Sequence, residues 1–445
     1  MSSAASRSEF VEHVATAVGM ALACSGYAML GESQRLLSGG WLLGAVLAAG
    51  LSCIVLSFSV GELAAMFPSA PGIRTYLRHA FGDTASLALT LLLFSLVGLF
   101  ASVEVHYFLA AAREVLPELS EFWTGVAVIV MVCAVNLVGL EAPRRMQVAI
   151  TALLVLSLVG FSWAALAQSD SASLGRNAPP VPPSLATFVI VSGGCVFLFT
   201  GFEWVTSMGR SPESYRARIP VAMPVSLCVL LVVIGSLAWA SDGLRSEARY
   251  ALMPHLALGA RVGGPLGVQC MVMASLASMI TTFNAGLMGA SRLLYAVSRE
   301  RRFFEWGARV SARRGTPYGA VFSLSGLALM AHALTHALHA HGTVELVCAA
   351  IYCLVYSAFL VATVRLRQLR PGSPRVFRSP IPAWVQLLVA ALFALMSCAV
   401  LATDIRLVSA SVSVFMAAVV GSALLARYFV QRAPSPRAAL RPQSS

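Results

Sequence analysis

The residues best suited to binding chemistry in this sequence are small residues that interrupt two long apolar stretches. One stretch, residues 11–31, carries Ser25 and Gly26 at its middle. A helix that breaks there would leave backbone N–H groups and the positive end of a half-helix facing the centre of the stretch, which suits a carboxylate. A packing face of small residues is the alternative interpretation of this composition.

The second stretch, residues 184–210, combines glycines with an acid. Gly193, Gly194 and Gly201 interrupt it, and Glu203 lies well past its midpoint. A carboxylate inside an apolar stretch is costly unless it faces protein or water. Both features predict a break whose unpaired backbone groups bind a solute. A continuous helix with close-packed glycines and a hydrogen-bonded Glu203 is the alternative.

Composition identifies the elements that must position these residues. The chain is 58% hydrophobic and only 11% charged, with a mean hydropathy of +0.80, which excludes a soluble domain of 445 residues and indicates an integral membrane protein. Because about 20 apolar residues span a bilayer as a helix, the sequence predicts about twelve membrane helices. They are expected near residues 11–31, 40–66, 85–112, 122–140, 146–167, 185–209, 219–241, 266–297, 317–338, 343–366, 383–403 and 405–427.

The net charge of +12 could suggest nucleic acid, but the placement of the basic residues argues against it. All 31 are Arg, and they lie mostly between apolar stretches. With the N-terminus inside, 24 of the 31 fall in cytoplasmic segments, so the positive-inside rule explains them. We therefore expect both termini on the cytoplasmic side of the inner membrane. The polar first ten residues predict no cleavable signal peptide.

Other residue types exclude several kinds of chemistry. The nine Cys lie mostly in apolar stretches without a CxxC pair, which argues against disulfides and zinc sites. His332, His336, His339 and His341 lie at the outer end of span nine, and His332 and His336 have the i, i+4 spacing of a metal pair. No other type of ligand converges there, so no metal or cofactor is predicted. Absence of HExxH, GxSxG and paired aspartates argues against an enzyme.

The two interrupted stretches are the first and the sixth of the series, so they occupy equivalent places in two five-helix halves. This arrangement is expected of a transporter built from an inverted repeat. The predicted halves are residues 1–167 and 185–366. Two further helices follow within residues 383–427, and residues 431–445 are predicted to be a disordered tail.

Three ordered motifs resemble those of the amino acid-polyamine-organocation superfamily. Spans two and three are joined by GELAAMFPSAPGIRTYLRHAFG, which is close to ELxxxxPxxGGxYxYxxxxxG. The eighth span continues into NAGLMGASRLLYAVSRERRFFEWGARVSARRGTP, similar to SRxLYAxARDGxLPxxxxxxxxxGTP, and RPGSPRVFRSP resembles RPxxPRPFRxP. With FLFTGFEWV in span six, the resemblance covers most of the chain. It implies an all-α, LeuT-like fold with broken helices one and six and transport as the activity.

The resemblance also implies a substrate site at the first break. The family's GSG-like break falls on Cys24, Ser25 and Gly26, whose amides would hold a substrate carboxylate, with Tyr27 next in the same site. Cys24 stands where the family usually has a glycine, so the unwinding would be tighter than usual.

At the second break, the resemblance implies that the carbonyls of Phe199, Thr200 and Gly201 receive the substrate ammonium. Phe197 matches a gating aromatic, although one more apolar residue in an apolar span is the alternative interpretation. In span eight, Asn284 and Ala285 match positions beside the substrate side chain; small residues such as Ala285 also pack helices.

Energy coupling departs from the family pattern. Proton-coupled relatives carry a lysine in helix five, and the matching position is near Leu154, in a chain without Lys. The acidic pair that usually follows helix six falls on Arg210 and Ser211. Coupling therefore uses another group, or the protein is an exchanger or facilitator. Glu203 could take up protons or cap the broken helix, and the structural role is favoured.

Span three offers other ionisable groups, Glu104 and His106, in its outer half. Two residues apart, they are separated by about 200° on a helix, so at most one is expected to point inward. Satisfaction by a neighbouring helix is the alternative for either residue. Glu62, at the end of span two, is expected to form a structural ion pair with a loop Arg.

Together these features predict a secondary transporter or exchanger of amino acids that works by alternating access in the bilayer, with a proton or an exchanged solute as co-substrate. An amine or polyamine carrier is the alternative within transport. A non-transporting receptor or structural subunit on the same fold is the alternative outside it.

Overall fold

The computed structural model describes residues 3–38, 40–69, 72–139, 141–168, 182–242, 250, 252–301, 304–402 and 404–432. Every regular element in these ranges is helical, which confirms the predicted all-α class. The α-helices are α1 (Ser3–Ala21), α2 (Cys24–Leu36), α3 (Gly40–Met66), α4 (Gly72–Phe81), α5 (Asp83–Ala112), α6 (Glu121–Val138), α7 (Glu141–Ala167), α8 (Leu185–Val196), α9 (Ile219–Asp242), α10 (Pro254–Arg301), α11 (Tyr318–Ala337), α12 (His341–Leu369), α13 (Ala383–Val400) and α14 (Val408–Arg432). Short helical turns are η1 (Phe197–Phe199), η2 (Phe202–Ser207), η3 (Ser214–Arg218) and η5 (Glu305–Ala308).

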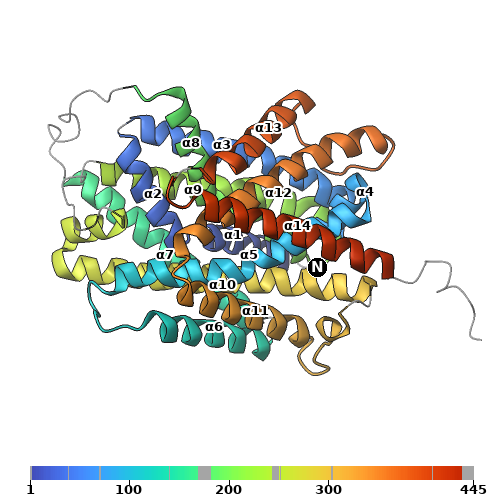
Figure 1. Cartoon of the computed structure of the whole chain (residues 1–445), viewed down its shortest axis with the longest axis horizontal. Helices are drawn as coiled ribbons and strands as arrows, with labels where there is room; N and C mark the ends of the chain where they lie inside the picture. Colours follow the sequence, from blue (N-terminus) through green and yellow to red (C-terminus); the bar gives the residue numbers. More distant parts are fainter. Residues whose placement is uncertain are drawn as a thin grey trace, which may run out of the picture.

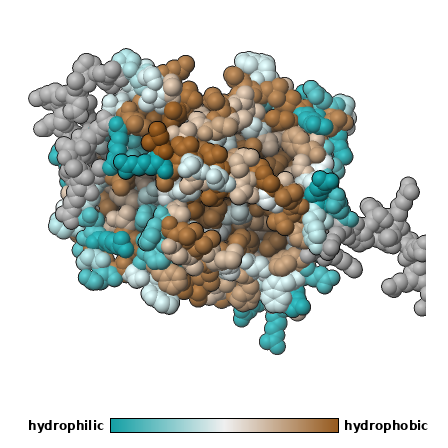
Figure 2. All heavy atoms as spheres, viewed as in Figure 1, coloured by the Kyte–Doolittle hydropathy of each residue, from teal (hydrophilic) through white to brown (hydrophobic). Residues whose placement is uncertain are grey.

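Within the described ranges, eleven helices are long and apolar enough to cross a membrane, or twelve if the bent pair α1–α2 forms one span. This agrees with the expected number of about twelve. Most of the helices run along the long axis of the molecule (Figure 1). In the space-filling view, hydrophobic residues cover the middle of the visible face and hydrophilic residues gather at its two ends (Figure 2). The exposed apolar middle is the surface expected to face lipid.

The interrupted helices lie at the centre of the bundle. In Figure 1, α1 lies in the middle of the bundle, where it packs against α7, α9 and α10, whereas α14 crosses the outside. Residues Ala17 to Ala28 of the first span are all nearly inaccessible to solvent. The core therefore forms around the breaks, and its packing fixes the groups that the breaks expose.

Two helical segments were missed by the prediction of spans. Helix α4, between spans two and three, is a short amphipathic helix that begins at Gly72 and ends before Gly82. Helix α10 starts at Pro254, earlier than the predicted residue 266, and is kinked at Gly264, whose φ of 54° lies in the left-handed region that favours glycine. The predicted tail, residues 431–445, lies outside the described residues from 433 onward.

One end of the bundle, here called the Arg-rich end, carries the start of α1, helix α4 and residues 209–218, 304–317 and 370–382. Arg74 of α4 is fully buried there and pairs with Asp83 at 2.7 Å and Glu300 at 3.2 Å. Burial lowers the pKa of the Arg74 guanidinium to about 10, so this group stays charged at neutral pH. The opposite end, here called the histidine end, carries His106, His332, His336, His341 and Glu121.

Candidate functional site

The first break separates α1 from α2 by a bend of 51°. It falls on Leu22 and Ala23, just before the predicted position, and Ala23 has extended backbone. Gly26 lies inside α2, where its N–H donates to the carbonyl of Ala23 at 3.0 Å. The break therefore does not use the conformational freedom of Gly26, and the amides that it exposes are those of Cys24 and Ser25.

The carboxylate of Glu104, on α5, caps these two amides. The N–H of Cys24 donates to Glu104 Oε2 at 2.7 Å, and the N–H of Ser25 donates to Glu104 Oε1 at 3.0 Å. The hydroxyl of Ser25 donates to the same Oε1. All three residues are buried. The first-turn N–H groups of a half-helix thus hold a carboxylate, as the sequence predicts for this break, but the carboxylate belongs to the protein.

Neighbouring contacts hold α2 against α10. The thiol of Cys24 donates to the carbonyl of Ser275 at 2.9 Å, and the hydroxyl of Tyr27 lies 2.7 Å from that of Ser278. The Tyr27 ring packs on His255, with centroids 4.3 Å apart. Tyr27 is therefore fixed between two helices directly beside the exposed amides.

The second break lies between α8 and η2, where the sequence predicts it. A single turn, η1, is followed by Thr200 in extended backbone and by Gly201 with a φ of 101°. A side chain at Gly201 would be strained by this φ, and its Cβ would also lie only 2.7 Å from Met20 Cγ of α1. Glycine is thus required at 201, where the two broken spans approach each other.

Glu203 folds back onto the second break. Its Oε2 accepts from the N–H of Gly201 at 3.2 Å and from the hydroxyl of Tyr356, on α12, at 2.7 Å. The same hydroxyl lies 3.0 Å from the Gly201 nitrogen. Glu203 Oε1 is buried with no hydrogen-bond partner among the described residues. Glu203 therefore caps the second break in this structure.

A small cavity of about 10 Å³, room for about one water molecule, lies beside Glu104. Its lining comes from α1, α5, α10 and α12, and Glu104 is its one charged member: Met20, Leu96, Val97, Phe100, Ala101, Glu104, Thr282, Phe283, Gly286 and Tyr352. The Phe197 ring lies 5.3 Å from that of Phe100, at the edge of this lining. The cavity is thus too small for an amino acid.

Asn284 and Ala285 lie away from this cavity. The amide nitrogen of Asn284 donates to Gln147 Oε1 at 2.8 Å and to the carbonyl of Pro143 at 3.0 Å, and its oxygen accepts from Asn136 at 2.9 Å. Ala285 is fully buried. With 3.6 residues per turn, Thr282, Phe283 and Gly286 share one face of α10, and Asn284 faces α6 and α7. Sequence matching did not resolve which face of the helix borders the cavity.

At the Arg-rich end, ion pairs join α1 to the segment that follows the sixth span. Arg210 pairs with Glu12 of α1 at 2.6 Å, and Arg218 pairs with Glu9 of α1. The hydroxyl of Ser214 also donates to Glu9, at 2.6 Å. The acids are thus on α1 and the cations follow the sixth span. Arg210 stands where the family usually has an acid, and Glu12 balances its positive charge.

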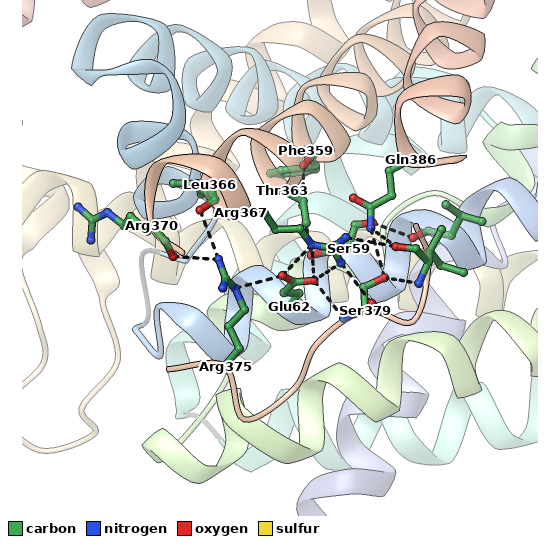
Figure 3. A network of polar contacts seen from close by, with 12 residues as sticks. Ser59, Glu62, Phe359, Thr363, Leu366, Arg367, Arg370, Arg375, Ser379 and Gln386 are labelled. Carbon is green, nitrogen blue, oxygen red and sulfur yellow. Dashed lines mark hydrogen bonds and ion pairs between the residues drawn. The ribbon is translucent and has the colours of Figure 1, made fainter. Parts of the chain in front are cut away.

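Glu62 forms the predicted ion pair with a loop Arg (Figure 3). Its carboxylate contacts Arg367 of α12 at 2.5 Å and Arg375 of the following loop at 3.2 Å, and it accepts from the N–H of Ser379 at 3.0 Å. Glu62 is fully buried. This network fastens the loop between α12 and α13 to the end of α3.

His106 points away from Glu104, as their spacing predicts. Its Nδ1 lies 3.1 Å from Glu121 Oε1, and its ring stacks on that of His341 at a centroid distance of 4.2 Å. Sequence reasoning did not single out Glu121, and it noted His341 only as one of the histidines at the outer end of span nine. Each is the first residue of its helix, so neither shows the periodicity of a helix face, and only the packing of separate helices brings them to His106.

Two other buried ionisable groups were also missed. Glu345 of α12 accepts from the hydroxyl of Tyr107, and His255 of α10 lies 2.7 Å from Ser275 Oγ. Glu345 lies two residues into the predicted tenth span, and its charge inside an apolar stretch was the available signal. His255 precedes the predicted eighth span, so the early start of α10 concealed it. Leu154, at the position of the family's lysine, is buried.

Comparison with known proteins places these features in context. A family model described as amino acid permease matches residues 14–425. An uncharacterized transporter of Mycobacterium bovis is 26% identical over 331 residues, 70% of each chain. L-asparagine permease 1 of the same organism is 24% identical over 68% of this chain and 66% of its own. The D-serine/D-alanine/glycine transporter of Escherichia coli is 23% identical over 59% of each chain.

Among solved structures, the fold is similar to that of an Eremococcus coleocola manganese transporter. The TM-score is 0.62 at 13% identity, and the match covers 96% of this chain and 95% of the other. At this identity the similarity concerns the fold alone.

Proposed function

The chain belongs to the amino acid permease family, and on this premise we propose that it carries amino acids across the cytoplasmic membrane by alternating access around its two helix breaks. The Arg-rich end, with the start of α1, is the cytoplasmic end of this arrangement. Residues 1–167 and 185–366 act as the two inverted repeats. Each repeat then contributes one break, α1–α2 and α8–η2, to a shared site.

The observation that carries this proposal is the carboxylate held by the start of α2. Glu104 shows that the amides of Cys24 and Ser25 can bind a carboxylate in a buried site. A hydrogen bond to a charged group is typically worth about 1.5–3 kcal/mol. A substrate carboxylate at the same amides would gain comparable bonds, while its ammonium would meet the carbonyls of Phe199, Thr200 and Gly201.

This arrangement makes Glu104 and the substrate carboxylate competitors for the same donors. Two carboxylates cannot share them without strong repulsion in a buried site. A proton bound to Glu104 removes its charge and weakens its hold on the amides, so the substrate carboxylate can replace it. Proton and substrate are then coupled through Glu104, without the lysine that the chain lacks.

The ion pairs of Glu9 and Glu12 with Arg218 and Arg210 form the cytoplasmic gate in this proposal, and Phe197 with Phe100 forms the cover nearest the cavity. In this proposal the structure is a closed state, because the cavity beside Glu104 has room for only about one water molecule. Alternating access requires one of these layers to open at a time.

A second candidate is transport of amines. It is favoured because Glu104 already accepts from the N–H groups of Cys24 and Ser25. An amine without a carboxylate does not need Glu104 to leave, and its ammonium would pair with the one charged group in the cavity lining. The apolar and aromatic remainder of that lining would contact the body of the amine. On this alternative, Glu104 is a permanent counterion.

Thermal stabilisation of the purified protein by matched pairs of ligands separates these functions. Each pair consists of an amino acid and the amine left after its decarboxylation, for example phenylalanine and phenethylamine. A ligand that binds only the folded protein raises the melting temperature. Stabilisation by the amino acid alone supports the first function, and stabilisation by the amine alone supports the second. If no pair stabilises the protein, a receptor or structural subunit on this fold is supported instead.

A further inference from the structure

We propose that His106, Glu121 and His341 form a zinc-binding site at the histidine end of the bundle, separate from the two helix breaks. His106 lies in the last two turns of α5, and Glu121 and His341 are the first residues of α6 and α12. One ligand atom from each lies within 4.8 Å of the other two.

The geometry centres on one carboxylate oxygen. Glu121 Oε1 lies 3.1 Å from His106 Nδ1 and 2.9 Å from His341 Nε2. The second contact is short but not aligned as a hydrogen bond, so His341 Nε2 has no hydrogen-bond partner among the described residues. This buried nitrogen is therefore not committed to a hydrogen bond and is available as a metal ligand.

The distances suit a small divalent ion. Zinc binds imidazole nitrogen at about 2.0–2.1 Å and carboxylate oxygen at about 2.0–2.2 Å. Tetrahedral ligands at these lengths lie roughly 3.3 Å apart. The two observed nitrogen–oxygen separations are within a few tenths of an ångström of this value. Two imidazoles and one carboxylate favour zinc over magnesium or calcium, which prefer oxygen ligands.

Access and packing are also suitable. The side chain of His106 is 39% exposed, whereas those of Glu121 and His341 are each 11% exposed. An ion can therefore enter from the aqueous side at His106 and reach two ligands held by packed helix starts. The imidazole rings are stacked, with an interplanar angle of 12°, so binding requires them to turn until their lone pairs converge. A water molecule would complete the fourth position.

The nearby histidines do not form this site. Both ring nitrogens of His332 already face other atoms, Ser102 Oγ at 3.4 Å and the carbonyl of Phe122 at 3.3 Å. The His332 and His336 rings lie 6.3 Å apart between centroids. His332 is thus engaged by other groups, and the proposed ligand set draws instead on residues from three helices.

Zinc titration of the purified protein, prepared without a polyhistidine tag and followed by isothermal calorimetry, tests the site. We expect one zinc ion per chain. Glu121→Gln and His341→Asn should each raise the dissociation constant for zinc at least tenfold. His339→Asn is the matched control, because His339 is at the same end but outside the triad, and asparagine tolerates its φ of 50°. Magnesium should give no binding heat.

X-ray absorption at the zinc edge of the wild-type protein gives a second measurement that needs no variant to fold. Two nitrogen ligands and oxygen ligands at about 2.0–2.2 Å are expected. The proposal is wrong if wild type binds no stoichiometric zinc, if sulfur appears among the ligands, or if both triad variants bind zinc as tightly as His339→Asn. None of these results bears on substrate transport, because zinc binding is measured without substrate.

Discussion

Glu104 and Ser25 are joined twice: the Ser25 N–H donates to Glu104 Oε1 at 3.0 Å, and the Ser25 hydroxyl donates to the same oxygen. The residues are 79 positions apart and belong to two different spans. This contact makes the start of α2 a carboxylate site that is already filled in the closed structure. The predictions below follow from it and from the packing around it.

Ser25→Ala removes one of the three donors to Glu104 and leaves both amide bonds. We expect the melting temperature to fall by an amount equivalent to about 1.5–3 kcal/mol, the usual worth of a hydrogen bond to a charged group. Ser162→Ala is the control, because the buried hydroxyl of Ser162 donates within its own helix, to Leu158 at 2.7 Å. Equal melting temperatures for the two variants would show that the Ser25 hydroxyl contributes nothing particular to the site.

Gly26→Val should abolish uptake while the protein still inserts and folds. A Cβ at Gly26 would lie 3.4 Å from Leu198 of η1, so alanine fits at ordinary contact, whereas the two γ-methyl groups of valine reach into the space between the two breaks. Gly26→Ala is therefore the matched control and should retain uptake. Normal uptake by a well-expressed Gly26→Val protein would contradict the placement of the site at the first break.

Glu62→Gln should destabilise the protein strongly. It leaves Arg367 and Arg375, with side chains only 15% and 12% exposed, facing a neutral amide, and breaking a buried pair typically costs about 3–5 kcal/mol. Glu32→Gln serves as the control, since its pair with Arg35 is about half exposed and should contribute at most about 1 kcal/mol. The measurement is the melting temperature of each variant in the same detergent, and similar values would show that the Glu62 ion pairs contribute little to stability.

Tyr356→Phe tests the structural role of Glu203. The variant removes the hydroxyl that donates to Glu203 Oε2, while the Gly201 amide bond remains. We expect a lower melting temperature and slower uptake with an unchanged pH profile of uptake. A changed pH profile would instead indicate that Glu203 exchanges protons during transport.

The fold was predictable because apolar length and Arg placement determine membrane helices largely without tertiary information. The second break was also predictable, since Gly201 requires a positive φ that few other residues adopt. The first break was located less well. Its unpaired amides are satisfied by Glu104, and a partner 80 positions away leaves no local signal in the sequence near Cys24.

The other site residues were predicted less well, because the sequence does not show which face of a helix borders the cavity. Asn284 was matched by motif, yet the cavity is lined by Thr282, Phe283 and Gly286, which differ from it by about 100–200° around α10. The triad of His106, Glu121 and His341 depends on how three helices pack. Spacing within one helix indicated only that Glu104 and His106 cannot share a face, and the structure confirms this.

Uptake by proteoliposomes containing wild type or Glu104→Gln tests the central claim most directly, that Glu104 and a substrate carboxylate compete for the α2 amides under control of a proton. Glutamine keeps the size of the side chain but cannot gain or lose a proton, and its amide nitrogen cannot accept from an N–H group. With an amino acid that stabilises the wild-type protein, we predict proton-driven accumulation by wild type. Glu104→Gln should lose this accumulation and its pH dependence, yet retain counterflow exchange. A Glu104→Gln protein that accumulates substrate with the wild-type pH profile would contradict the claim.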